Sequence, residues 1–149
     1  MPIVQRTEQD LIAAMKARDE LRLSVLRMMK TAFKLKQVEL TRPLDDSEAV
    51  AILRTLVKQR RESAEQFRQG GREELASKEE AEIGIVEEYL PAAAGDDEIE
   101  AAVTAAIAES GAATAKDLGK VMKAAMAKLA GKNVDGKRVS ERARAKLGA

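Results

Sequence analysis

The chain has 149 residues, a size that suits one compact domain or two small ones. It contains no cysteine and no histidine, which excludes disulfides, thiol catalysis, the commonest zinc ligand and the commonest general base. The formal net charge is +1, and the 45% hydrophobic but only 2% aromatic content is typical of a helical protein. Acid–base chemistry would depend on Asp, Glu, Lys or Tyr89, so we expect no independent catalysis, no metal and no cofactor.

Apolar residues at helical spacing predict two helices in the first 40 residues. Thr7 and Asp10 resemble a capping box at the start of the first helix, and Asp19 is placed to start the second. The second helix has a wide apolar stripe, which predicts a central place in a bundle. That stripe comprises Leu21, Val25, Met28, Ala32 and Leu35, with Leu26, Met29 and Phe33 alongside.

Two more helices are predicted between residues 46 and 90. The segment "TRPLDDSE" (41–48) interrupts the pattern, and Asp46 or Ser47 can cap the helix that follows. Gly70 and Gly71 end that third helix. The fourth, from about residue 72 to 90, is strongly acidic and is closed by Pro91.

Three helices are predicted after residue 95. "PAAAGDD" (91–97) is typical of a linker, and Asp96 and Asp97 can cap a fifth helix. The sixth helix has the most regular stripe, which consists of Leu118, Val121, Met122, Ala125, Met126 and Leu129. After "GKNVDG" (131–136), a short seventh helix contains Val139, Ala143 and Leu147.

No run of residues alternates with period two, so the predicted fold is all-α. We expect a helical unit over residues 1–90, a linker over 91–95 and a basic three-helix bundle over 96–149. No apolar run approaches the roughly 20 residues of a membrane span, and the N-terminus has no apolar signal core, so we expect a cytoplasmic protein without a membrane partner.

Charge is unevenly distributed along the chain. From Lys116 onward there are ten basic and three acidic residues, a net of +7, whereas the first 115 residues contain 16 basic and 22 acidic residues, a net of −6. Such asymmetry indicates a polyanionic partner, although basic helix ends are also common in proteins that bind no nucleic acid. The lack of aromatic residues favours a structured RNA over a stacked single strand. A DNA-reading helix-turn-helix and a membrane-surface helix rank lower than RNA binding.

The cluster Lys58, Arg60 and Arg61 is explained by ion pairing with Glu62 and Glu65.

The glycines of the last segment call for a reason. Gly119 near the start of a helix costs about 1 kcal/mol relative to alanine, which close packing of a second helix or of an RNA backbone would explain. Gly131 is expected to end the helix in left-handed geometry. Asn133 and Gly136 are expected to accept positive φ in a turn.

Three blocks of sequence resemble the GatB/YqeY family: "RDELRLSVLRMMKTA" (18–32), "KQRRESAEQFRQGGREELASKEEAEIGIVEEYLP" (58–91) and "DLGKVMKAAMAKLAGKNVDGKRVS" (117–140). The resemblance covers nearly the whole chain, and implies an all-helical protein with a small C-terminal bundle. The same module forms the tail of the B subunit of glutamine-dependent aspartyl/glutamyl-tRNA amidotransferase, where it is understood to hold the outer corner of the tRNA. The catalytic body of that subunit has no counterpart here.

The resemblance implies a non-catalytic accessory protein that binds tRNA or associates with tRNA amidotransferase, although a carbon–nitrogen ligase label follows the family by association. Amidotransferase or aminoacyl-tRNA synthetase components are further expected partners. The alternative is a protein-interaction module that docks through the acidic fourth helix without RNA. The positions that the resemblance marks as RNA-facing are Lys116, Gly119, Lys120, Lys123, Lys132, Asn133, Gly136 and Lys137.

Overall fold

A computed structural model describes residues 1–148, which divide into two compact units, one from Met1 to Leu90 and one from Pro91 onward. The all-α prediction is confirmed, since the described residues form helices and a single isolated β-bridge. The helices are α1 (Ile3–Ala17), α2 (Glu20–Leu40), α3 (Asp46–Gln69), α4 (Glu73–Glu87), α5 (Asp96–Ser110), the 3-10 turn η1 (Ala115–Asp117), α6 (Leu118–Lys128) and α7 (Gly136–Lys146).

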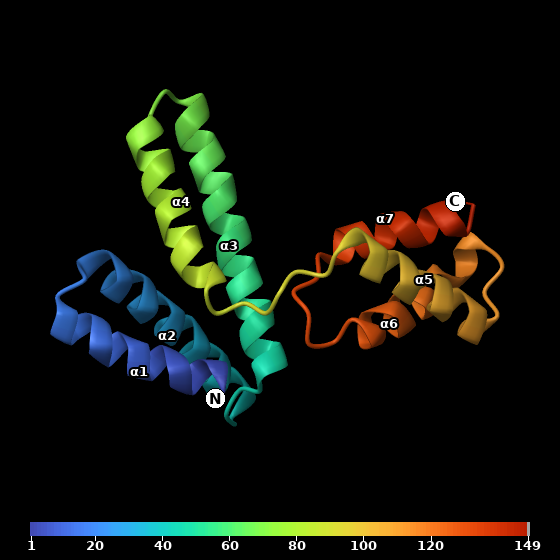
Figure 1. Ribbon diagram of the computed structural model, residues 1–149, viewed down its shortest axis with the longest axis horizontal. Helices are drawn as coiled ribbons and strands as arrows, with labels where there is room; N and C mark the ends of the chain where they lie inside the picture. Colours follow the sequence, from blue (N-terminus) through green and yellow to red (C-terminus); the bar gives the residue numbers. More distant parts are fainter. Residues whose placement is uncertain (149) are drawn as a thin grey trace. The chain divides into compact units, whose positions relative to one another are not determined.

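The first unit consists of two helical hairpins, α1 with α2 and α3 with α4 (Figure 1). The Asp19 side chain accepts the backbone N–H of Arg22 and so caps α2, as predicted. Gly70 and Gly71 form the turn between α3 and α4, where Gly71 has a φ of +74° that a side chain would strain. Short connections therefore keep the helices of each hairpin antiparallel neighbours.

The core of the first unit is built around α2, as its wide stripe predicted. Phe33, Leu26 and Met29 are fully buried, and they pack with Leu53 of α3 and Val86 of α4, among other side chains. The predicted stripe is displaced, however, because Leu21 and Leu35 lie exposed at its edge. A wide apolar stripe covers more of the helix surface than its neighbours can bury.

Two helix starts differ from the prediction. Thr7 lies inside α1, buried, with its hydroxyl donating to the carbonyl of Ile3, so it caps nothing. The capping box of α3 is formed by Asp45 and Glu48 rather than by Asp46 or Ser47. Glu48 also accepts two hydrogen bonds from Arg42, at 2.7 and 2.9 Å. These bonds, with the backbone N–H of Asp45, lower the pKa of Glu48 to about 2.

Arg60 connects α3 to α4 in a part-buried position. Its guanidinium pairs with Glu79 at 3.0 Å and with Glu82, whose side chain is one of two buried polar side chains among the described residues. Arg60 and Arg61 do form ion pairs, but the prediction of Glu62 and Glu65 as partners is wrong, because the acids lie on α4, and Lys58 forms no ion pair within the described residues. Removal of Arg60 would leave the Glu82 carboxylate desolvated and unpaired.

Tyr89 joins the two ends of the first unit. Its hydroxyl donates to the carboxylate of Asp10 on α1, and the Arg6 guanidinium lies 4.5 Å above its ring. Burial, and then the hydrogen bond to Asp10, raise the pKa of Tyr89. Because Tyr89 is the only tyrosine and the chain has no tryptophan, its fluorescence reports the unfolding of the first unit alone.

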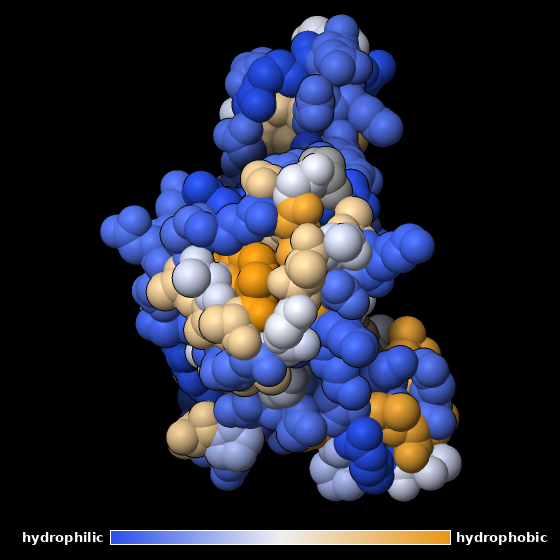
Figure 2. Space-filling model, turned by 90° about the vertical axis from the view of Figure 1, so that its right-hand side faces the viewer, coloured by the Kyte–Doolittle hydropathy of each residue, from blue (hydrophilic) through white to orange (hydrophobic). Residues whose placement is uncertain are grey.

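The second unit is a three-helix bundle with a core of small side chains. Val103 of α5, Val121 of α6 and Val139 of α7 are completely buried, together with several alanines. The backbone of Asn133 exchanges hydrogen bonds with Ala92 and Ala94, at 3.0 and 2.9 Å, which ties residues 92–94 to this unit. Figure 2 shows a face of the unit on which apolar residues gather in one area surrounded by hydrophilic residues.

Within residues 1–148, no helix has both the length and the apolar character that a membrane crossing requires.

We expect Arg60→Ala to lower the free energy of unfolding of the first unit by about 2 kcal/mol, because it leaves Glu82 buried without its cation. Urea titration followed by tyrosine fluorescence measures this change. The matched control is Arg61→Ala, whose side chain is 65% exposed where it pairs with Glu87, and which should change stability by less than about 0.5 kcal/mol. Equal losses in the two variants would contradict the energetic role given to burial.

Glu48 should contribute to the acid sensitivity of the first unit. A carboxyl group whose pKa is lowered on folding stabilises the folded state above its unfolded pKa, and that contribution disappears as the pH falls toward the folded value. Glu48→Gln should therefore flatten the decline in unfolding free energy between about pH 4.5 and pH 2. Glu74→Gln is the control, since Glu74 makes no ion pair within the described residues. An unchanged slope in Glu48→Gln would refute the assignment.

Candidate nucleic-acid interface

Three of the predicted lysines form a row on α6 and the turn before it. Lys120 and Lys123 are three residues apart, which places them on one face of α6, and Lys116 lies on the 3-10 turn η1 directly before that helix. Val121 and Ala125 occupy the opposite face and are fully buried. All three lysines are exposed, and none forms an ion pair among residues 1–148. We call Lys116, Lys120 and Lys123 the α6 lysine row.

Gly119 lies beside this row, in the first turn of α6. A Cβ atom placed on Gly119 would have no heavy atom within 4 Å, so close packing of another helix of this unit does not account for the glycine. No side chain caps α6, because the Asp117 carboxylate accepts the N–H of Ala113 instead. The helix start therefore has no side-chain cap and no side chain at Gly119, while the N–H of Leu118 donates to the carbonyl of Ala115 in η1.

The remaining predicted positions lie in the loop before α7 and at its start. Gly131 has a φ of +86°, as predicted, but Asn133 and Gly136 do not have positive φ. The reason is that the Asn133 backbone bridges to residues 92–94, while Gly136 is already the first residue of α7. Asp135 caps α7 by accepting the N–H of Lys137 at 3.0 Å. Of this group, the Lys137 side chain is exposed, whereas Lys132 lies 3.7 Å from Glu98.

Acids of α5 neutralise much of the basic segment. The pairs are Lys128 with Glu109, Lys132 with Glu98, Arg138 with Asp96, and both Arg142 and Lys146 with Glu100. The hydrogen bond from Lys146, with the charge of Arg142, lowers the pKa of Glu100. The second unit thus has ten basic and eight acidic residues, a net of +2.

The structure therefore separates the predicted site into two groups. The α6 lysine row and Lys137 are exposed without ion pairs within the described part of the chain, whereas Lys132 is partly compensated. Arg144, which the sequence analysis did not select, is exposed and unpaired in the same sense. Arg144 follows Lys137 by seven residues, a spacing that predicts a shared helix face, although Glu141 lies between them on that face.

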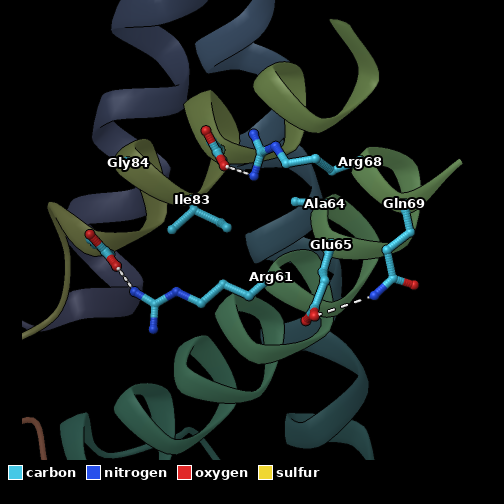
Figure 3. Close-up of a pocket in the computed structure, with 9 residues that line it drawn as sticks. Arg61, Ala64, Glu65, Arg68, Gln69, Ile83 and Gly84 are labelled. Atoms are coloured by element: carbon cyan, nitrogen blue, oxygen red, sulfur yellow. Dashed lines mark hydrogen bonds and ion pairs between the residues drawn. The ribbon is translucent and has the colours of Figure 1, made fainter. Parts of the chain in front are cut away.

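An open groove lies between α3 and α4, and no pattern in the sequence indicates it. Figure 3 shows this open groove, of about 620 Å³, with Ala64, Ile83 and Gly84 between two ion pairs. Arg61 holds Glu87 at 2.7 Å, and Arg68 holds Glu80 at 2.8 Å. Its cations are already bound to carboxylates, so the groove offers an anion no unpaired arginine.

The same pairs affect the surface of the acidic fourth helix. Arginines of α2 and α3 hold the carboxylates of Glu73, Glu79, Glu80, Glu82, Glu87 and Glu88. Bidentate contact with Arg68 lowers the pKa of Glu73. The acidic sequence of α4 is therefore largely neutralised by helices of its own unit.

Comparison with known proteins gives similarity to fungal mitochondrial proteins. Proteins named "Altered inheritance of mitochondria protein 41, mitochondrial" are 35% identical over 86 residues in Eremothecium gossypii and 33% identical over 88 residues in Lachancea thermotolerans. These matches cover 57% and 58% of this chain but 47% of each relative, so the chain spans about half the length of the curated relatives it matches. The compartment of this chain stays a prediction.

A family comparison covers almost the entire sequence. The family described as "Yqey-like protein" matches residues 4–147, which include all the helices of both units except the first residue of α1, and all the predicted site residues. The chain therefore belongs to the family of YqeY-like proteins.

Proposed function

We propose that this protein is a non-catalytic RNA-binding accessory module that holds tRNA through its second unit. The observation that carries the proposal is the α6 lysine row beside the open start of α6 at Gly119. Its three cations have no carboxylate partner within the described residues, so phosphate binding would not have to displace one. The resemblance to the tail of the tRNA amidotransferase B subunit supports tRNA as the polyanion.

The side chains at this surface favour recognition of shape and phosphate. Tyr89 and Phe33 are buried in the first unit, and α6 contains no aromatic residue on which a base could stack. Lys116 and Lys123 are seven residues apart, or about 10 Å along a helix axis, so the row would contact neighbouring phosphates of one strand. A structured RNA fits this arrangement better than a single strand read base by base.

The alternative is a protein-interaction module that docks through α4 without RNA. It is less well supported, because the carboxylates of α4 are held by arginines of the same unit. The RNA-binding proposal includes amidotransferase or aminoacyl-tRNA synthetase components as partners, because these enzymes would act on the tRNA that the protein holds. The experiments below separate RNA binding from this alternative.

Lys120→Glu combined with Lys123→Glu should weaken tRNA binding at low salt by at least about tenfold, because two phosphate contacts become repulsive. Gel-shift titration with bulk tRNA measures the affinity. The slope of log K against log salt is expected at about −3 for the wild-type chain. In the variant it should become less negative by about two. Wild-type protein that fails to shift tRNA would refute the proposal.

The control for this pair is Lys58→Glu combined with Lys78→Glu. It changes net charge by the same amount at exposed lysines of the first unit that form no ion pair in the described chain. Equal weakening by both pairs would mean that total charge, and not the α6 lysine row, determines binding.

Gly119→Ala tests the open helix start separately from charge. Nothing in the structure meets the added methyl group, so we expect no loss of stability, and a gain of up to about 1 kcal/mol. If RNA backbone lies against the glycine, tRNA binding should nevertheless weaken several-fold. Gly84→Ala, at an equally open and exposed helical glycine of the first unit, should leave tRNA binding unchanged. Calorimetry and gel shifts of both variants give the answer, and unaltered binding by Gly119→Ala would count against close approach of RNA.

A further inference from the structure

Large exposed apolar side chains are concentrated on the first two helices. Among residues 1–148 they are Met1, Ile12, Met15, Leu21, Leu35 and Val38, and none lies on α3 to α7. Leu35 and Val38, both on α2, are 69% exposed. An isolated exposed leucine needs no explanation, but a group of this kind indicates a surface that another molecule covers.

Six residues of α2, exposed except for the partly buried Met28, follow a heptad pattern. Leu21, Met28 and Leu35 are seven residues apart, and Ser24, Thr31 and Val38 occupy the positions three residues after each. We call these six residues the α2 seam and assign the first three to heptad position a and the others to d. The core is formed mainly from other faces of the helix, through Val25, Leu26, Met29 and Phe33, and Met28 packs against it from the edge of the seam. Spacing of three and four residues is what a second helix needs in order to pack along α2.

Positive charge borders one edge of the α2 seam. Arg27 and Lys34 share the g positions with Glu20, Lys30 lies nearby, and all three cations are exposed without an ion pair in the described chain. Glu8 of α1 lines the same small hollow as Lys30 and Lys34, but no oxygen of it lies within 4 Å of their nitrogens. The opposite edge of the seam faces the rest of the first unit, since Val25 at position e is buried and Met28 contacts Arg60 of α3.

A second copy of the chain is a poor occupant for this surface. With the e side covered by the first unit itself, two copies would meet through their g sides, and each copy would bring Arg27 and Lys34 but only one carboxylate, that of Glu20. Like charges so placed oppose association. Carboxylates opposite Arg27 and Lys34 would instead be attracted.

We propose that the α2 seam is a docking surface for an acidic amphipathic helix of a partner protein. The partner's apolar residues pack on Leu35, Val38 and Leu21, and its flanking carboxylates pair with Arg27 and Lys34. This surface belongs to the first unit and is independent of the α6 lysine row, so either proposal can fail without the other.

The test uses the full chain and a synthetic peptide of about four heptads with leucine at a and d and glutamate at e and g. Fluorescence anisotropy of the labelled peptide should show binding. A peptide with lysine at e and g should bind at least about tenfold more weakly, because its charges oppose Arg27 and Lys34. No binding of the acidic peptide, or equal binding of the two peptides, would overturn the proposal.

Variants then locate the peptide. Leu35→Ser with Val38→Ser should reduce affinity for the acidic peptide at least about tenfold, with no loss of helicity because both side chains are exposed. Ile12→Ser with Met15→Ser is the matched control on α1 and should leave affinity unchanged. Arg27→Glu with Lys34→Glu should reverse the preference toward the basic peptide. A control pair that weakens binding as much as the seam pair would refute the assigned surface.

Two further measurements distinguish the other occupants. Lys120→Glu with Lys123→Glu should leave peptide binding unchanged, and loss of binding in that variant would place the peptide on the second unit and refute the proposal. Sedimentation of the wild-type chain should give a monomer. A dimer that Leu35→Ser with Val38→Ser converts to monomer would assign the seam to a second copy and overturn the proposal.

Discussion

Ion pairs between neighbouring helices determine which charges remain available and add directional contacts to the packing of each unit. The cores contain few large side chains, since one of the two phenylalanines is fully buried and the second unit relies on valine and alanine. Such cores specify helix contacts weakly, so pairs such as Arg60 with Glu82 add directional contacts that only one packing satisfies. The exposed pairs contribute little energy each, but they fix where each cation is directed.

This pairing changes the meaning of the net charge. A segment with a net charge of +7 lies against α5, whose acids hold five of its ten basic side chains. A polyanion would meet the cations left over, and these include the α6 lysine row. A local arrangement of three lysines beside an open helix start, rather than the total charge, is therefore the basis for expecting phosphate contacts.

The sequence was a good guide to helices and a poorer guide to partners. Helical spacing correctly predicted α6 with Val121 and Ala125 inward, because burial of an apolar face is a local property of the sequence. It did not show that Leu35 would remain outside, since that depends on how much of α2 the other helices cover. Nor did it identify Glu79 and Glu82 as partners of Arg60, because they are close in space and about twenty residues away in sequence. The prediction of a positive φ at Gly136 was wrong, because Gly136 is the first residue of α7 and not the last residue of the turn.

The α6 lysine row and the α2 seam differ in chemistry in a way that bears on function. The first combines lysines with a bare backbone and has no exposed large apolar side chain, which suits phosphate and sugar. The second joins Leu35 and Val38 to cations, which suits a folded segment with both apolar and acidic groups. Because the side chains of Lys120 and Leu35 contribute little to the packing of their own units, substitutions there report on binding rather than on folding. An accessory protein that brings an RNA and a protein together would need two such surfaces with different salt dependence, steep for the phosphate contacts and shallow for the apolar ones.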